Sequence, residues 1–168
     1  MTLVNLPYKI LIEKDVSGML PDFLDSLGFR SIVVVCNDNV LRIAGDRIKD
    51  VRNASIVKAG SMEKSYLQSL AKKIDADLLI GMGGGRSIDI AKYLAHLANK
   101  QWVAFPTILS HDGVVSSRAS LENNGMRISV EAKEPIAIIA DLGIIKNAPY
   151  RWVASGAGDV LSNISAVE

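Results

Sequence analysis

Hydrophobic residues recur along this chain with two alternating periods. Short apolar runs, most of them rich in branched side chains, predict buried strands at 8–13, 30–36, 54–57, 77–81, 102–105 and 136–141. Between them, apolar residues at helical spacing predict helices over 17–27, 39–48, 61–74 and 87–99. The run at 30–36 is apolar on both faces, which is typical of a parallel strand covered by helices on each side. The chain is therefore predicted to be α/β, with a doubly wound, mostly parallel, Rossmann-like sheet.

Local signals refine the ends of these elements. Gly28 should stop the first helix, which carries Pro21 in its first turns. Ser61 should open the third predicted helix with a capping box, although Glu63 falls one position early for that motif.

The pattern changes after residue 105. Residues 106–113 form a loop rich in hydroxyl and turn residues, and Asn124-Gly125 between alternating segments predicts a β-hairpin over 118–130 with a type I′ turn. From Pro149 onward the apolar spacing is helical, and the pattern shows no C-terminal cap before residue 168. We expect the hairpin to be an insertion and the last helix to begin a further helical domain that is truncated.

Composition narrows the class of protein. The 168 residues are 49% hydrophobic, enough for one sizeable α/β core. A net charge of +1 gives no electrostatic sign of a nucleic acid or membrane-surface partner. The single cysteine, Cys36, excludes a disulfide framework and fits a reducing compartment. Without a signal-peptide pattern or an apolar run of about 18 residues, the sequence predicts a cytoplasmic protein without membrane insertion.

The stretch 81–85 contains four glycines between a predicted strand and a predicted helix. Such a turn offers free N–H groups and the positive end of the helix dipole to an anion, and glycine lets the anion approach. It is not a Walker A loop, because Gly85-Arg86-Ser87 replaces the required G-K-[ST] ending. Arg86 also occupies the last glycine position of the Rossmann fingerprint. A tight turn without a ligand is the alternative, but so many glycines favour an anion site.

A second polar loop follows the next predicted strand. Thr107, Ser110 and Ser116 could bond ribose, carboxamide or phosphate groups, and Asp112 could bind a substrate hydroxyl. Because ligands of open α/β sheets bind at the carboxyl ends of the strands, both loops should flank one crevice. Turns that only satisfy their own backbone remain the alternative for each residue.

Three segments carry a family resemblance: GGGRSIDIAK at 83–92, PTILSHDGVVSSRASL at 106–121 and GAGDVLSNISAVE at 156–168. In order and spacing they resemble the sn-glycerol-1-phosphate dehydrogenases, within the superfamily of iron-type alcohol dehydrogenases, glycerol dehydrogenases and dehydroquinate synthases. The resemblance implies reduction of dihydroxyacetone phosphate to sn-glycerol 1-phosphate with NADH or NADPH and a zinc ion, which supplies the glycerol backbone of archaeal-type membrane lipids. The partner would be a small phosphorylated triose.

The resemblance also implies roles for individual residues. The cofactor pyrophosphate would lie on Gly83, Gly84, Gly85, Arg86, Ser87 and Asp89, and the nicotinamide side on Thr107, Ser110 and Ser116. Asp112 and Asp159 would be catalytic residues that contact the substrate, and Asp159 would also be a zinc ligand. Asp38, or Asn37 beside it, would meet the adenosine ribose, where a free carboxylate favours NAD over NADP because it repels a 2′-phosphate.

A catalytic zinc ion needs about three protein ligands. The two histidines here, His96 and His111, are expected to be a helix surface residue and a residue that orients its loop. The resemblance places the family's zinc histidines after residue 168. We therefore expect a dinucleotide-binding domain over 1–147, the start of a metal and substrate domain over 148–168, and no complete metal site.

Alternatives remain open at this point. The chain could belong to a glycerol dehydrogenase, to a dehydroquinate synthase-like enzyme or to a non-catalytic nucleotide-binding module. Arg118 could be a phosphate ligand or an ordinary solvated arginine, and the sequence leaves a homo-oligomer open.

Overall fold

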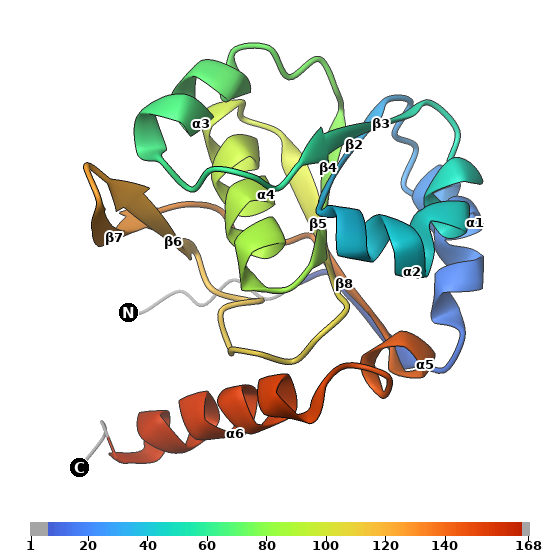
Figure 1. Ribbon diagram of the computed structural model, residues 1–168. Helices are drawn as coiled ribbons and strands as arrows, with labels where there is room; N and C mark the ends of the chain where they lie inside the picture. The colour runs from blue at the N-terminus through green and yellow to red at the C-terminus, as the bar shows by residue number, and fades with distance from the viewer. Residues whose placement is uncertain (1–6, 166–168) are drawn as a thin grey trace.

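A computed structural model describes residues 7–165, in which a parallel sheet lies between two layers of helices (Figure 1). The six strands run in the order β1-β8-β5-β4-β2-β3, and every pairing is parallel. They are β1 (Lys9–Glu13), β2 (Ile32–Cys36), β3 (Ala54–Lys58), β4 (Leu78–Gly83), β5 (Gln101–Pro106) and β8 (Ala137–Asp141). A separate antiparallel hairpin consists of β6 (Arg118–Asn123) and β7 (Met126–Glu131). The predicted fold class and hairpin insertion are confirmed.

The helices cover both faces of the sheet. They are the 3-10 helix η1 (Val16–Met19), α1 (Leu20–Ser26), α2 (Asp38–Lys49), α3 (Lys64–Ala71), α4 (Gly85–Leu97), α5 (Leu142–Ile145) and α6 (Tyr150–Ser165). Helices α1 and α2 lie on one face, and α3 and α4 lie on the other (Figure 1). None of the described helices is long and apolar enough to cross a membrane.

The predicted capping box of the third helix is wrong. Helix α3 begins at Lys64, and Glu63 is its N-cap residue without a side-chain hydrogen bond. The Ser61 hydroxyl oxygen instead accepts a hydrogen bond from the Glu63 N–H at 3.1 Å. The pair has i, i+2 spacing, whereas a capping box needs i, i+3, so the contact closes a local turn before the helix.

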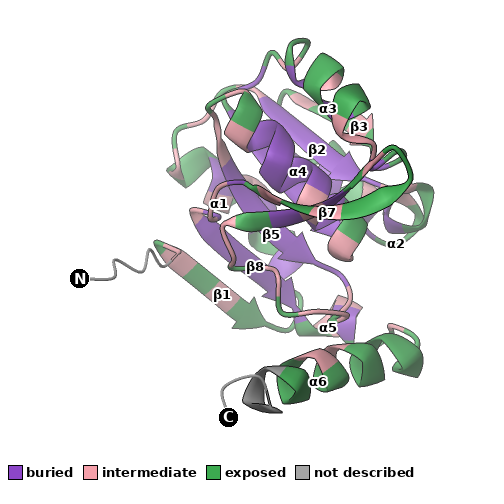
Figure 2. Cartoon of the chain, turned by 90° about the vertical axis from the view of Figure 1, so that its left-hand side faces the viewer, coloured by how far each residue is buried: buried purple, intermediate pink, exposed green. Residues whose placement is uncertain are grey.

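Alternate residues of the central strands contribute their side chains to two hydrophobic cores, one on each face of the sheet. In β2, Ile32, Val34 and Cys36 pack with α1 and α2, whereas Val33 and Val35 pack with α3 and α4. All five residues are buried, as expected of a strand covered on both faces (Figure 2).

The strand order contains a switch point. From β2 the chain moves outward to the edge strand β3, and it then returns to place β4 on the other side of β2. The connections that leave β2 and β4 therefore diverge, which opens a crevice at the carboxyl ends of these strands. The glycine turn begins at the end of β4, so it lies beside this crevice.

Close packing of α4 on β4 depends on Gly81. A Cβ atom at this position would lie 2.9 Å from the Ala91 Cβ and 3.2 Å from the Ile88 Cα. These are shorter than ordinary van der Waals contacts, so only glycine lets the helix approach the strand this closely. The first glycine of the turn therefore serves helix packing.

We predict that Gly81→Ala destabilises the fold by about 1–3 kcal/mol, because the added methyl group pushes α4 away from the sheet. Gly45→Ala is the matched control, because a Cβ there meets no atom within 4 Å and the residue lies in the middle of α2. That control should gain about 0.5–1 kcal/mol from its better helix propensity. Urea unfolding followed by circular dichroism measures both, and equal effects at the two positions would contradict the packing argument.

Candidate functional site

A cavity of about 890 Å³ lies at the carboxyl ends of the strands. Its walls come from the start of α4, the loop after β5, the hairpin and α6. Eight of the residues expected to bind cofactor or substrate line it: Gly84, Gly85, Arg86, Ser87, Asp89, Ser110, Ser116 and Asp159. The two polar loops predicted from the sequence therefore flank one crevice, as expected.

The N-terminus of α4 presents unsatisfied donors to this cavity. Gly84 is the N-cap residue, and no side chain of the described residues caps the helix. The first-turn N–H groups consequently have no partner within the helix. The Ser87 side chain is 1% exposed, and its hydroxyl oxygen has no hydrogen-bond partner among the described residues. A buried hydroxyl of this kind is rare, and together with the helix dipole it fits an anionic group such as a diphosphate.

A side chain is disfavoured at each of the last three glycines of the turn, for different structural reasons. Gly83 has a φ of 145°, a conformation that residues with side chains rarely adopt. A Cβ on Gly84 would lie 2.6 Å from the Ile108 Cδ1, and one on Gly85 would lie 2.7 Å from the His111 Nε2. Side chains of the loop after β5 thus press against the turn, so the glycines also serve contacts within the chain.

His111 orients its own loop, as the sequence analysis expected. Its Nδ1 accepts a hydrogen bond from the Gly113 N–H at 2.8 Å, so the neutral ring carries its proton on Nε2. That nitrogen faces Gly85 at the start of α4. The loop and the helix N-terminus are thus in direct contact.

Three predicted cofactor residues, Asp38, Gly83 and Thr107, lie outside the cavity lining, and so does the predicted substrate residue Asp112. The Asp38 carboxylate is paired with the Lys58 ammonium at 2.9 Å, and both side chains are largely exposed. Asn37 does line the cavity, and its side-chain oxygen caps α2 by accepting the Val40 N–H at 3.0 Å. Thr107 is buried, and its N–H donates to the Gly83 carbonyl at 3.0 Å.

Asp159 lines the cavity, and Asp112 lies against it outside the lining. An Asp159 carboxylate oxygen accepts the Asp112 N–H at 2.9 Å, and hydrogen bonds from Asp112 hold the pKa of Asp159 below its usual value. Helix α6 approaches this loop closely, since a Cβ on Gly156 would lie 2.4 Å from the Leu109 carbonyl oxygen. The Ser155 hydroxyl adds a bond to the Ser110 carbonyl at 3.1 Å. The two residues expected to contact substrate are therefore adjacent.

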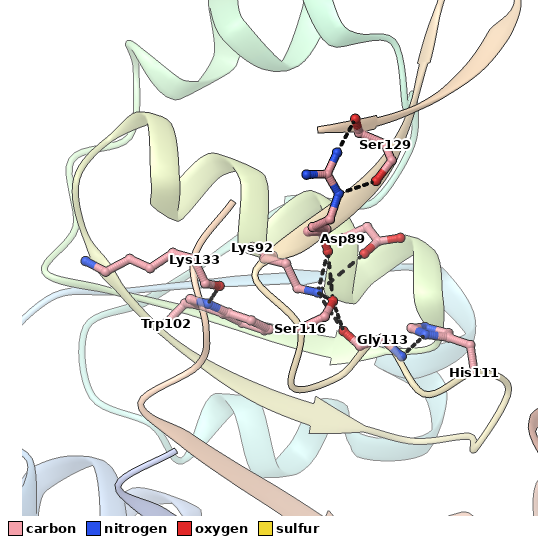
Figure 3. A network of polar contacts seen from close by, with 9 residues as sticks. Asp89, Lys92, Trp102, His111, Gly113, Ser116, Ser129 and Lys133 are labelled. Carbon is pink, nitrogen blue, oxygen red and sulfur yellow. Dashed lines mark hydrogen bonds and ion pairs between the residues drawn. The ribbon is translucent and has the colours of Figure 1, made fainter. Parts of the chain in front are cut away.

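Asp89 and Lys92 lie one turn apart on α4 and face the hairpin (Figure 3). The Asp89 carboxylate is 3.8 Å from the Lys92 ammonium and accepts a backbone hydrogen bond from Ser120. Burial raises the pKa of Asp89 despite the neighbouring cations, and burial lowers the pKa of Lys92 despite the neighbouring carboxylates. The sequence analysis missed Lys92. The only signal for it was its i+3 spacing from Asp89, among several apolar residues of the helix.

The family is shown by comparison with known proteins. A family model described as iron-containing alcohol dehydrogenase matches residues 11–149. The chain belongs to this family. A glycerol-1-phosphate dehydrogenase [NAD(P)+] of Thermoplasma volcanium is 36% identical over 98% of this chain, and one of Methanospirillum hungatei is 38% identical over 97%. The chain spans about half the length of these curated relatives, 49% and 47% respectively.

Solved structures agree with this membership in the iron-containing alcohol dehydrogenases. A probable glycerol dehydrogenase from Sinorhizobium meliloti 1021 superposes with a TM-score of 0.85 at 25% identity, covering 96% of this chain and 47% of that one. A sulfoacetaldehyde reductase from Bifidobacterium kashiwanohense, solved in complex with NAD+, shares the fold with a TM-score of 0.83 at 18% identity, over 96% of this chain and 52% of that one.

The described residues do not fit a zinc ion on their own. Nowhere among them do three His, Cys, Asp or Glu side chains come together as a metal site. Asp159 lies at the crevice, whereas His96 lies in the last turn of α4. Because a catalytic zinc needs about three protein ligands, Asp159 would need further ligands beyond the described residues to hold one.

For this family member we predict that Gly156→Ala separates α6 from the loop after β5, because the new methyl group would meet the Leu109 carbonyl. The Asp112 N–H then loses its bond to Asp159, and its amide proton resonance should move upfield in a ¹H–¹⁵N spectrum. Gly158→Ala is the matched control on the same helix, because a Cβ there meets nothing within 4 Å. An unchanged Asp112 resonance in Gly156→Ala would refute the docking contact.

Proposed function

We propose that this chain is the cofactor-binding part of an NAD(P)-dependent dehydrogenase that reduces dihydroxyacetone phosphate to sn-glycerol 1-phosphate. The observation that carries the proposal is the buried, unpartnered Ser87 hydroxyl at the uncapped N-terminus of α4, inside the crevice. The relatives that share 36% and 38% of their residues with the chain are glycerol-1-phosphate dehydrogenases, which supports the choice of substrate.

In this proposal the glycine turn binds the cofactor diphosphate. The first-turn N–H groups of α4 and the Ser87 hydroxyl donate hydrogen bonds to its oxygens, and Arg86 adds a positive charge at the cavity wall. Asn37, at the end of β2, lies where an adenosine ribose would meet the wall, and Asp38 follows it. The nicotinamide would then extend toward Ser110 and Ser116. When bound, this group supplies or accepts the hydride.

The substrate would bind at the end of the crevice where Asp112 and Asp159 meet. The Asp159 carboxylate is held ionised by its hydrogen bonds from Asp112, so it can accept a hydrogen bond from a substrate hydroxyl. Such a contact orients the triose relative to the nicotinamide and contributes to the reaction through positioning. In the proposal Asp159 also provides one zinc ligand, and the remaining ligands would come from outside the described residues.

Glycerol is the second candidate substrate, because the chain superposes on a probable glycerol dehydrogenase with a TM-score of 0.85. The two activities differ in whether the substrate carries a phosphate. Turnover of dihydroxyacetone phosphate and of glycerol by the longer protein that contains this chain, with each cofactor and with or without zinc, distinguishes them.

We predict that the 168-residue chain binds NADH or NADPH in a calorimetric titration. Ser87→Ala should weaken binding by about tenfold, because it removes one hydrogen bond to a charged group. Ser69→Ala is the control, since Ser69 lies exposed in α3 and bonds only its own helix at Ser65. A folded chain that binds neither cofactor would refute the proposed dinucleotide site.

We further predict that the 168-residue chain does not reduce dihydroxyacetone phosphate, because its described residues supply only one of the expected zinc ligands. The measurement is NADH oxidation at 340 nm with zinc added. Turnover above that of a Ser87→Ala, Asp159→Ala double variant would contradict this prediction.

A further inference from the structure

The Lys92 ammonium is completely buried, yet all of its donors have partners. It donates to the Gly113 carbonyl at 2.6 Å, the Arg118 carbonyl at 2.8 Å and the Ser116 hydroxyl at 3.2 Å (Figure 3). The Asp89 carboxylate at 3.8 Å offsets part of its charge. An ammonium has three protons, and a buried charge is tolerated only when such groups are satisfied. The buried acceptors around position 92 therefore match the three donors of a lysine ammonium.

All three acceptors belong to one short segment, 113–118, which leads from the crevice loop into β6. The Ser116 hydroxyl proton is shared between the Gly113 and Arg118 carbonyls, at 3.3 and 3.1 Å. The Ser116 hydroxyl thus bonds both the ammonium and the backbone of its own segment, which holds the segment around the ammonium. Lys92 therefore holds the entry to the hairpin.

Trp102 lies beside Lys92 and holds the exit from the hairpin. The Lys92 ammonium is 5.8 Å from the centre of the Trp102 ring, and the indole N–H donates to the Lys133 carbonyl at 2.7 Å. Lys133 is the second residue after the end of β7. Two neighbouring buried side chains, one on α4 and one on β5, thus fix both ends of the 113–133 insertion.

The hairpin is a wall of the crevice, whereas Lys92 is not. Side chains on one face of the hairpin, including Arg118, Ser120 and Ser129, line the cavity. Lys92 does not line it, although it lies on the helix whose first turn contributes to the lining. Lys92 therefore connects the helix on the diphosphate side of the crevice with the segment that leads into the hairpin, beside the Asp89 contact to Ser120 and the packing of Ala119 and Leu121.

We infer that Lys92 is a positioning residue: by binding the 113–118 segment it sets the distance between the hairpin and the glycine turn, and so the affinity for the nicotinamide half of the dinucleotide. The inference rests on the proposed function for the identity of the ligand. Lys92 would not touch the dinucleotide, and the adenosine diphosphate half, which lies on the glycine turn, would bind independently of it.

The test compares the Lys92→Met variant with the unmodified chain, both as the full 168 residues. Methionine has a similar shape but no donor, so the Gly113 and Arg118 carbonyls are left with the single Ser116 hydroxyl proton between them. We expect the NADH dissociation constant, measured by fluorescence titration, to rise by about tenfold, and that of ADP to change less than about twofold. Lys73→Met is the matched control, because Lys73 is exposed just after α3, and it should change neither constant. Lys92→Arg keeps the charge and several donors, so it should recover part of the NADH affinity.

Hydrogen exchange supplies the second readout. In Lys92→Met, amides in 113–131 should exchange faster, while those in β2, β4 and β5 remain as protected as in the unmodified chain. If Lys92→Met does not fold, Trp102→Phe removes the bond to Lys133 and part of the buried ring beside Lys92, and it should produce a smaller change of the same kind. Equal weakening of NADH and ADP, or unchanged exchange in the hairpin, would overturn the inference. If the unmodified chain binds neither ligand, the proposed function fails, and the exchange data alone decide whether Lys92 holds the hairpin.

Discussion

The contact between α4 and β4 at Gly81 is the constraint on which the site depends. Because the helix lies directly on the strand there, its N-terminus is held at the edge of the sheet and points into the crevice. The same helix carries the hairpin on its outer side, where Ala119 and Leu121 join the core. Most of α4 is consequently buried, and a polar residue on almost any of its faces must find a partner within the protein.

This arrangement changes the explanation of the glycine turn. The sequence suggested that something approaches the backbone closely, and the structure shows several partners that do. Gly81 admits the body of α4, Gly83 allows an unusual backbone conformation, and Gly84 and Gly85 admit Ile108 and His111. The turn therefore joins a strand, a helix and a neighbouring loop. These internal demands account for a glycine pattern that follows neither the Walker A loop nor the Rossmann fingerprint, while Ser87 still provides an anion donor.

Local patterns predicted most of the fold, because most of its strands and helices follow from nearby residues. The hairpin is an example: Asn124 and Gly125 have φ values of 52° and 76°, as a type I′ turn requires. Helix α5 could not be found this way, because only Leu142–Ile145 form it and it depends on the Asp141 carboxylate, which also accepts N–H groups from Asp15 and Ser17 far away in sequence. Asp38 was placed near the crevice, but its pairing with Lys58 depends on the register of β2 and β3. Lys92 resembled a surface lysine because the segment that buries it comes more than 20 residues later.

The loop after β5 sets the distance between the proposed diphosphate site and the proposed substrate site. Its first residue bonds the glycine turn through the Thr107 N–H, and its middle packs against that turn through Ile108 and His111. Its other side contacts α6 through Leu109 and through the bond between Asp112 and Asp159. The same few residues therefore touch both the proposed diphosphate site and the proposed substrate site. Any displacement of α4 or α6 must move this loop, so the distance between the two sites is set by packing within the chain before any ligand binds.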